Sequence, residues 1–209
     1  MAESDEKYNL IIEGAYNIFT ESGLRNVSMD DISRSLGISK KTLYQFVDNK
    51  VDLLKKINIY IERLIINRIE ELDKMELNAI DVLLEMSKIA NAKHFKINPK
   101  ITFEFRKYYP QVFNDYIGIK RDLIVNHIKK NIDKGINEGL YRPELNKDIV
   151  AQLYFQKIED FHKLENVDFE SFSYEKVFEV MFENHIRGIA NSKGIEYFEK
   201  RKEILNFNI

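Results

Sequence analysis

The chain has no cysteine, and among its 209 residues only three are proline and eight are glycine. Without cysteine the protein forms no disulfides and no thiolate zinc sites. The composition is compatible with a reducing cytoplasm, and we predict a cytoplasmic protein. Proline and glycine interrupt helices, and they are scarce here beside abundant lysine, glutamate, leucine and isoleucine. This balance predicts a mostly helical protein.

The sequence also lacks long hydrophobic runs. A membrane-spanning helix needs about 20 consecutive apolar residues. The most apolar stretch, Leu64–Ile66, is followed at once by Asn67 and Arg68. The N-terminus is polar and acidic, which is unlike a signal peptide. We therefore expect no membrane partner, and a chain that is 44% hydrophobic and 32% charged is expected to fold throughout.

Common enzyme signatures are missing as well. There is no G-x-x-x-x-G-K-[ST] loop, no G-x-G-x-x-G and no G-x-S-x-G motif. The one metal-like fragment is the E-x-x-H spacing of Glu159 and His162, and a di-iron bundle needs two such motifs with two further carboxylates. His185 lacks the matching acid, because Phe182 stands three residues before it. We expect no catalytic residue, no metal and no cofactor.

The most informative stretch that is present runs from residue 28 to residue 50. Ser28 with Asp31 has the spacing of a capping box and predicts the start of a helix over 29–36. Gly37 makes a turn, and Ser39 caps a second short helix, in which Leu43 and the ring of Tyr44 are expected to pack inward. Two short helices joined by a glycine turn can present the second one to the major groove of DNA.

The local charge of this stretch differs from that of the whole chain. The formal net charge is −2, yet no acidic residue lies between Asp31 and Asp48, where the bases are Arg34, Lys40 and Lys41. Phosphate contacts supply most non-specific DNA affinity, so this acid-free window favours a local DNA-binding face. Short helix pairs with a glycine turn also occur as plain packing units, and that alternative is open on this pattern alone.

Apolar residues recurring every three or four positions predict helices along the rest of the chain. These helices cover 6–22, 48–74, 78–95, 99–108, 110–139, 147–163 and 173–191, and the tail 193–209 is predicted as another short helix without a defined position. Gly23 ends the first of them and Asn146 caps the one at 147–163. The helix over 48–74, at about 1.5 Å per residue, spans roughly 39 Å and can link a DNA-binding part to a distant body.

Two helices near the C-terminal end have wider apolar stripes than one core requires. They are 147–163 and 173–191. Extra apolar surface on a helix pair predicts a four-helix bundle shared between two protomers, and a twofold dimer is the commonest way to bury such surface. A homodimer would also supply two recognition helices separated by about 34 Å, one turn of duplex, or a multiple of it.

Residues 8–54 resemble the N-terminal domain of TetR-type transcriptional regulators. The motifs that carry this resemblance are Glu13-Gly14-Ala15, Phe19, Gly23, Val27–Ile32, Leu36–Tyr44, Asn49-Lys50 and Leu53-Leu54. One position departs from the family pattern, since Val47 stands where an aromatic residue is usual and Phe46 precedes it. We expect the ring of Phe46 to turn into the small core instead.

The resemblance implies an all-α fold with a three-helix helix-turn-helix DNA-binding domain over 1–50. A long helix would join it to a helical effector-binding and dimerisation domain over 51–209. It also implies eight residues in contact with a double-stranded DNA operator. The predicted base contacts come from Ser39, Lys40, Lys41 and Gln45. The predicted phosphate contacts come from Thr42, Tyr44 and Lys50, and from the backbone N–H groups that follow Ser28.

The resemblance further implies a repressor that a small molecule releases from its operator. The residues predicted to contact that effector are mostly aromatic: Phe103, Tyr108, Tyr109, Phe113, Tyr116, His127, Tyr154, Phe155 and His162. The alternative that these rings only fill the core stays open. Two other functions also stay open, a helical enzyme or metal-binding bundle and a helical adaptor that binds proteins.

Overall fold

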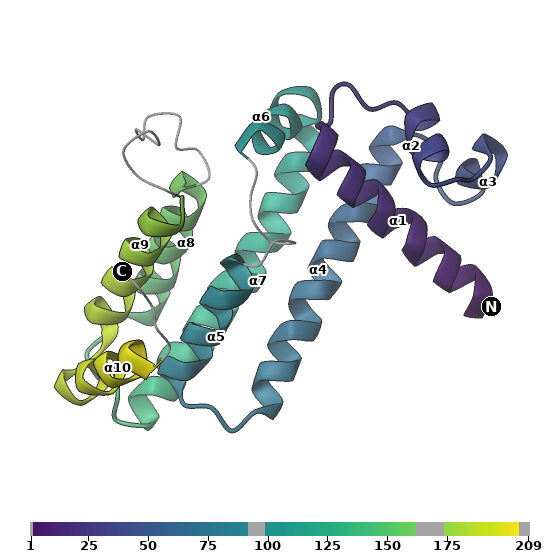
Figure 1. The fold of residues 1–209 in the computed structure, drawn as a ribbon. Coiled ribbons are helices and arrows are strands. Elements are labelled where there is room, and N and C mark those ends of the chain that lie inside the picture. Colours follow the sequence, from purple (N-terminus) through teal and green to yellow (C-terminus); the bar gives the residue numbers. More distant parts are fainter. Residues whose placement is uncertain (1, 92–98, 162–173, 205–209) are drawn as a thin grey trace. The chain divides into compact units, whose positions relative to one another are not determined.

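The computed structural model describes residues 2–91, 99–161 and 174–204 of the chain. Ten helices make up these segments (Figure 1): α1 (Ala2–Ser22), α2 (Met29–Ser35), α3 (Lys40–Tyr44), α4 (Lys50–Lys74), α5 (Ala79–Asn91), α6 (Pro99–Tyr108), α7 (Pro110–Asn137), α8 (Lys147–Phe161), α9 (Tyr174–Ile189) and α10 (Ser192–Ile204). The prediction of an all-α fold is confirmed, and the tail forms α10. None of the helices in these segments combines the length and the apolar character that crossing a membrane requires.

The chain divides into two compact units. The head unit contains the described residues up to Glu70 together with those between 99 and 120, so it holds α1 to α3, most of α4, α6 and the first part of α7. The body unit contains the described residues of 71–96 and 121–209. The predicted domain boundary after residue 50 stays a prediction.

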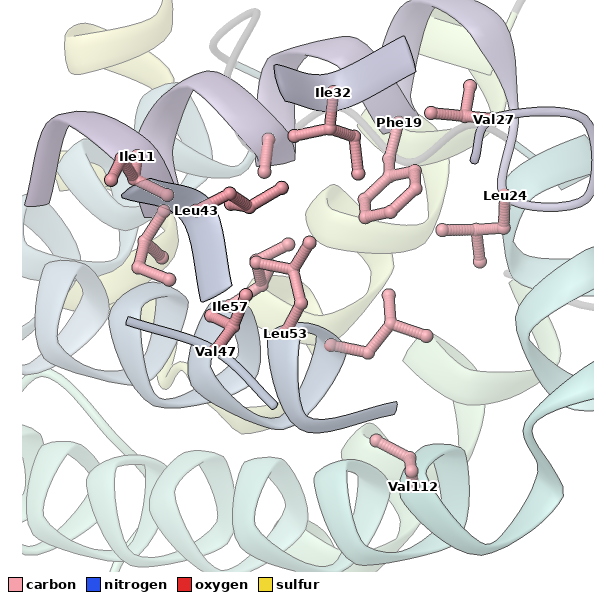
Figure 2. Packing of buried hydrophobic residues seen from close by; sticks show 13 residues of the cluster. Ile11, Phe19, Leu24, Val27, Ile32, Leu43, Val47, Leu53, Ile57 and Val112 are labelled. Atoms are coloured by element: carbon pink, nitrogen blue, oxygen red, sulfur yellow. The ribbon is translucent and has the colours of Figure 1, made fainter. Parts of the chain in front are cut away.

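The head unit has one hydrophobic core built from helices that lie far apart in sequence. Figure 2 shows its side chains, with Ile11 and Phe19 from α1, Ile32 from α2 and Val112 from α7 among them. Ile12, Ile32, Leu43 and Leu53 are fully buried in this core. The spacing of these apolar residues along each helix is the one that predicted the helices, so local pattern and tertiary packing agree.

The core bears on two predictions about α3 and the residues after it. Val47 fills the core directly and is only 1% exposed, and Phe46 is partly buried and packs against the same core. The ring of Phe46 also lies 6.4 Å from the ring of Tyr8, centroid to centroid. Tyr44 was predicted to pack its ring inward but is 48% exposed. Leu43, one residue earlier, takes the buried place on the helix, and its neighbour in sequence therefore faces outward.

The body unit is held by apolar packing and by a small number of buried polar contacts. Asn131 in α7 donates from Nδ2 to the carbonyl of Ala79 at 2.8 Å, and Tyr141 donates from its hydroxyl to Asn131 Oδ1 at 3.1 Å. Burial raises the pKa of the Tyr141 hydroxyl, which therefore stays a donor. These two hydrogen bonds pair the buried polar groups of Asn131 and Tyr141 and help to fix α5 against α7.

The tail helix α10 is tied to α5 within the body unit. Asp81 in α5 is 7% exposed and accepts hydrogen bonds from Tyr197 Oη at 2.6 Å and from Arg201 Nε at 2.7 Å. The same carboxylate accepts from Asn78 Nδ2 at 3.0 Å. A buried carboxylate needs such partners to offset the loss of water. The position of α10, which the sequence left undefined, is therefore set in part by Asp81, together with the ion pair of Lys202 with Glu183 in α9 at 2.9 Å.

Candidate nucleic-acid interface

The N-terminus of α2 is closed by the capping box that the sequence predicts. Asp31 N donates to Ser28 Oγ at 3.2 Å, and Ser28 N donates to Asp31 Oδ2 at 2.9 Å. Ser28 Oγ also donates to Asp31 Oδ2 at 2.5 Å, and this hydrogen bond, followed by the one from Ser28 N, lowers the pKa of the Asp31 carboxyl. The two residues satisfy backbone groups that an open helix end would leave to water, which fixes the residue at which α2 begins.

The short helix α3 is capped in the same way and follows a glycine turn. Gly37 has a φ of +65°, a conformation that a residue with a side chain adopts at a cost. Ser39 Oγ accepts from Thr42 N at 3.0 Å, and the two hydroxyl groups lie 2.8 Å apart. Lys40, Lys41 and Gln45 are exposed. The predicted base-contacting side chains of α3 are thus presented to solvent by a helix with a defined start.

The bases of this unit are not isolated from acids in space, although they are in sequence. Lys40 Nζ lies 2.5 Å from Asp30 Oδ2, and Arg34 lies 3.6 Å from Asp31 across one turn of α2. Both pairs are exposed, so they contribute little to stability and can be exchanged for contacts with phosphate. The acid-free window of the sequence begins after Asp31. The fold nevertheless places Asp30, which precedes the window, next to Lys40 inside it.

Lys50, at the start of α4, has partners inside the protein. Its Nζ donates to the carbonyl of Leu24 and, at 2.5 Å, to the carbonyl of Val27. The ammonium also lies 5.4 Å from the ring centroid of Phe19 and 5.9 Å from that of Tyr109. Burial lowers the pKa of the Lys50 ammonium, while the negative charges of Glu104 and Asp31 raise it. The phosphate contact predicted for Lys50 stays a prediction, but the structure gives this amine two backbone partners that the sequence did not reveal.

The residues predicted to contact an effector fall into different compact units. The first five of them lie in the head unit: Phe103, Tyr108, Tyr109, Phe113 and Tyr116. Phe103 and Tyr108 are 45% and 38% exposed, and Lys107 Nζ lies within 5.3 Å and 5.6 Å of their ring centroids. Tyr109 packs against the head core. These rings have identifiable packing or surface positions, and their role toward a ligand stays a prediction.

The other described candidates lie in the body unit, where the structure adds His185, which sequence reasoning had set aside. The rings of Tyr154 in α8 and His185 in α9 stack with centroids 3.7 Å apart. His185 is 6% exposed, and burial lowers its pKa to about 3. Within the described part of the chain, the Nε2 atoms of His127 and His185 are buried and have no hydrogen-bond partner. Phe155 is 5% exposed, and His162 lies outside the described residues.

The described residues contain no group of three or more histidine, aspartate or glutamate side chains that could hold a metal ion. Glu159 is buried in α8, and its E-x-x-H partner His162 is not among the residues described.

Comparison with known proteins identifies the segment around α1 to α4. Residues 11–57 match the family model described as "Bacterial regulatory proteins, tetR family". The chain is 25% identical over 170 residues to the uncharacterized HTH-type transcriptional regulator YhgD of Bacillus subtilis (strain 168), covering 77% of this chain and 86% of that protein.

Two further proteins resemble this chain, one over a short segment and the other over most of its length. Over 62 residues, 27% of this chain and 34% of the other, it is 37% identical to the biofilm operon icaADBC HTH-type negative transcriptional regulator IcaR of Staphylococcus epidermidis. A transcriptional regulator from Saccharomonospora viridis, solved in complex with choline, has the same fold with a TM-score of 0.73 at 17% identity. This match covers 90% of this chain and 99% of that one.

Proposed function

Because the chain is a TetR-family helix-turn-helix transcriptional regulator and not an enzyme, we propose that it is a homodimeric repressor that a small molecule releases from its operator. DNA binding itself follows from the family. The proposal adds the direction of regulation, the oligomeric state and the response to a ligand.

The observation that carries the proposal is the presentation of α3. A capped helix with Lys40, Lys41 and Gln45 exposed can enter a major groove. The N-terminus of α2, with its first backbone N–H groups and Ser28, can face a phosphate at the same time. Repression is supported by IcaR, a protein named as a negative regulator, which shares 37% identity over 62 residues with this chain.

Selection of preferred sites from a random pool of duplex DNA tests this proposal directly. We expect a pseudo-palindromic site whose half-sites lie about one helical turn apart or a multiple of it. Fluorescence anisotropy with that site should show affinity falling linearly on a log–log plot as salt rises, by about 0.9 in slope for each phosphate neutralised. A pool that yields no enriched site, or an affinity that ignores salt, would contradict DNA-binding repression and favour the adaptor function.

The homodimer is supported by exposed apolar side chains on α8 and α9. Ile149 and Leu153, four residues apart on one face of α8, are 56% and 59% exposed, and Val180 in α9 is 45% exposed. Residues at this spacing form one stripe, and stripes on two neighbouring helices form a patch that a second copy of the chain can cover. The α8 and α9 helices pack against each other in the body unit, so both stripes belong to one body.

Sedimentation or light scattering of a Leu153→Asp variant tests this interface. A charge in the centre of the patch should convert the dimer to a monomer at micromolar concentration, because the charge would be buried without a partner. The matched control is Ile59→Asp in α4, where another apolar side chain is 44% exposed, and this variant should stay dimeric. A monomeric wild type, or a Leu153→Asp dimer, would contradict the proposed interface.

The effector response is supported by His127 and His185, the histidines of the body unit that lie within the described residues. A buried polar atom without a partner is costly, so native structures rarely keep one without a role. His127, Tyr154 and His185 bring two hydrogen-bonding ring nitrogens and an aromatic face into the interior of one unit. These are the kinds of groups that orient a small molecule in a mostly apolar site. The choline complex of the Saccharomonospora viridis protein adds that a regulator of the same fold has been seen with a small cation.

Thermal-shift screening of a metabolite library against the wild type and His185→Phe tests the effector site. Phenylalanine preserves stacking on Tyr154 but removes both ring nitrogens. A ligand of this site should raise the melting temperature of the wild type and have little effect on the variant. The same compound should weaken operator binding, and DNA should weaken its binding by the same factor, because coupling is reciprocal. A stabilising ligand that leaves operator affinity unchanged would not be the effector.

A further inference from the structure

The strongest contact between the helix-turn-helix segment and a later part of the chain is made by Glu104 in α6. Its Oε2 accepts hydrogen bonds from Leu24 N at 2.6 Å and from Arg25 N at 3.0 Å, across 80 and 79 residues of sequence. Glu104 is 8% exposed. A carboxylate leaves water at a high cost unless donors replace the lost hydration, and hydrogen bonds to an ionised group are stronger than neutral ones. Both residues it binds belong, like α6, to the head unit.

Lys50 binds the same loop with a positive charge, where Glu104 binds it with a negative one. Its ammonium donates to the carbonyls of Leu24 and Val27, so the backbone of Leu24 gives its N–H to an anion and its C=O to a cation. The negative charge of Glu104 favours the charged form of Lys50 and counters the effect of burial on the pKa of this amine. The loop over 23–27 is therefore held between two opposite charges, the buried carboxylate of Glu104 in α6 and the half-buried ammonium of Lys50 in α4.

The loop is shaped to receive the carboxylate closely. Gly23 has a φ of +86°, and a Cβ built at this position would lie 3.0 Å from Glu104 Oε2. A side chain here would strain the backbone and press on the acid. Beyond the loop, Val27 is buried in the head core, and the next residue, Ser28, is the N-cap of α2. The position of the loop thus determines where the first residues of α2 lie within the head unit.

We propose that Glu104 is a positioning residue for operator binding, through which α6 holds the 23–27 loop, and with it the start of α2, in the shape that fits DNA. This inference rests on the proposed function as a DNA-binding repressor. It makes α6 a structural part of the DNA-binding unit, although α6 begins about 50 residues after the helix-turn-helix stretch over 28–50 ends. It also means that a change in the position of α6 alters operator affinity through this one carboxylate.

Two substitutions in the full-length chain separate the hydrogen bonds from the charge. Glu104→Ala removes both acceptors, and its operator affinity should fall roughly tenfold or more, because two buried amides lose their partner. Both amides bind the same oxygen, so the amide oxygen of Glu104→Gln can take its place, and this variant should bind within about threefold of the wild type. Hydrogen exchange at the Leu24 and Arg25 amides should become fast in Glu104→Ala and stay slow in Glu104→Gln.

Ile101→Ala supplies a control for a loss of stability alone, because Ile101 lies in the same helix and packs against the same core. Compared at equal thermal stability, this variant should bind the selected operator within about threefold of the wild type. The proposal is overturned if Glu104→Ala binds like the wild type, if Glu104→Gln fails to rescue, or if Ile101→Ala weakens binding as much as Glu104→Ala. A wild type that selects no DNA site would instead overturn the proposed function, together with this extension of it.

Discussion

In the head unit, the buried carboxylate of Glu104 and the half-buried ammonium of Lys50 meet backbone groups. Glu104 accepts from two amides and Lys50 donates to two carbonyls, so their charges are offset inside the unit that contains them. In the body unit, Asp81 is satisfied in a comparable way, yet the Nε2 atoms of His127 and His185 are buried without a partner among the described residues. In the head unit, these hydrogen bonds join parts of the unit itself and fix its shape. In the body unit, the two imidazole nitrogens are left with hydrogen-bonding positions that a bound molecule can use.

The largest expected effect concerns the exposed lysines of α3. Lys40→Ala combined with Lys41→Ala should lower operator affinity at least about thirtyfold, because each lost base or phosphate contact costs about 1–3 kcal/mol. Fluorescence anisotropy measures this loss. The matched control is Lys129→Ala with Lys130→Ala, an adjacent lysine pair in the body unit. If both double variants lost the same operator affinity, DNA binding could not be assigned to the head unit rather than the body unit.

Core truncation should affect each unit separately. Ile32 in the head unit and Ile186 in the body unit are both 0% exposed. Replacing either by alanine should lower the free energy of unfolding by about 2–5 kcal/mol through lost burial and the cavity left behind. Hydrogen exchange monitored along the chain should show the larger loss of protection in the unit that carries the substitution. If Ile32→Ala loosens both units equally, the chain unfolds as a single cooperative body.

The pH dependence of stability should be traceable in part to His185. Its pKa in the folded protein is about 3 and that of an unfolded histidine is about 6.5, so between these values the unfolded chain binds the extra proton. Stability should therefore fall as pH decreases from about 6.5 toward 3, by up to about 1.4 kcal/mol per pH unit from this residue. His185→Phe should flatten that part of the curve in urea titrations. An identical pH profile in the variant would show that the pKa of His185 is nearly the same in the folded and the unfolded protein.

The smallest expected effects concern helix caps, one from each unit. Ser28→Ala opens the cap of α2, and Asn146→Ala removes the acceptor of the Ile149 N–H, which lies 3.1 Å away in α8. Each should lower the free energy of unfolding by about 1 kcal/mol, measured by urea denaturation. Operator affinity should decrease only in Ser28→Ala, since that cap borders the DNA-binding surface. Equal effects on affinity would mean that caps act only through overall stability.

The features predicted correctly from sequence depend on neighbours a few residues apart. The capping box of Ser28 and Asp31 is an interaction across three residues, and the helices follow from apolar spacing within single turns. The inward position predicted for Tyr44 was wrong, because on a five-residue helix the choice of the buried face depends on the partners that the helix packs against.

The contacts that give the head unit its shape could not be predicted from sequence. Glu104 stands between two phenylalanines, a setting that suggests a buried acid, but nothing local indicates that its donors are 79 and 80 residues earlier. Lys50 looked like a phosphate contact because its family position suggested one, and the carbonyls it binds belong to a loop without a distinctive motif. His185 was set aside because it lacked a metal-binding companion, although a buried imidazole can matter without a metal.

The tie between Asp81 and Arg201 has a consequence for how the protein is made. The two residues are 120 positions apart, whereas Leu24 and Glu104 are separated by 80. At a synthesis rate of about 5–20 residues per second, the ribosome needs roughly 6–24 seconds to pass from Asp81 to Arg201. During that interval Asp81 lacks the arginine that neutralises it, whereas Glu104, the partner of the 23–27 loop, is made only about 80 residues after that loop. The head unit can thus close before the body unit, and α10 completes the packing of α5, a helix of its own unit that is made much earlier.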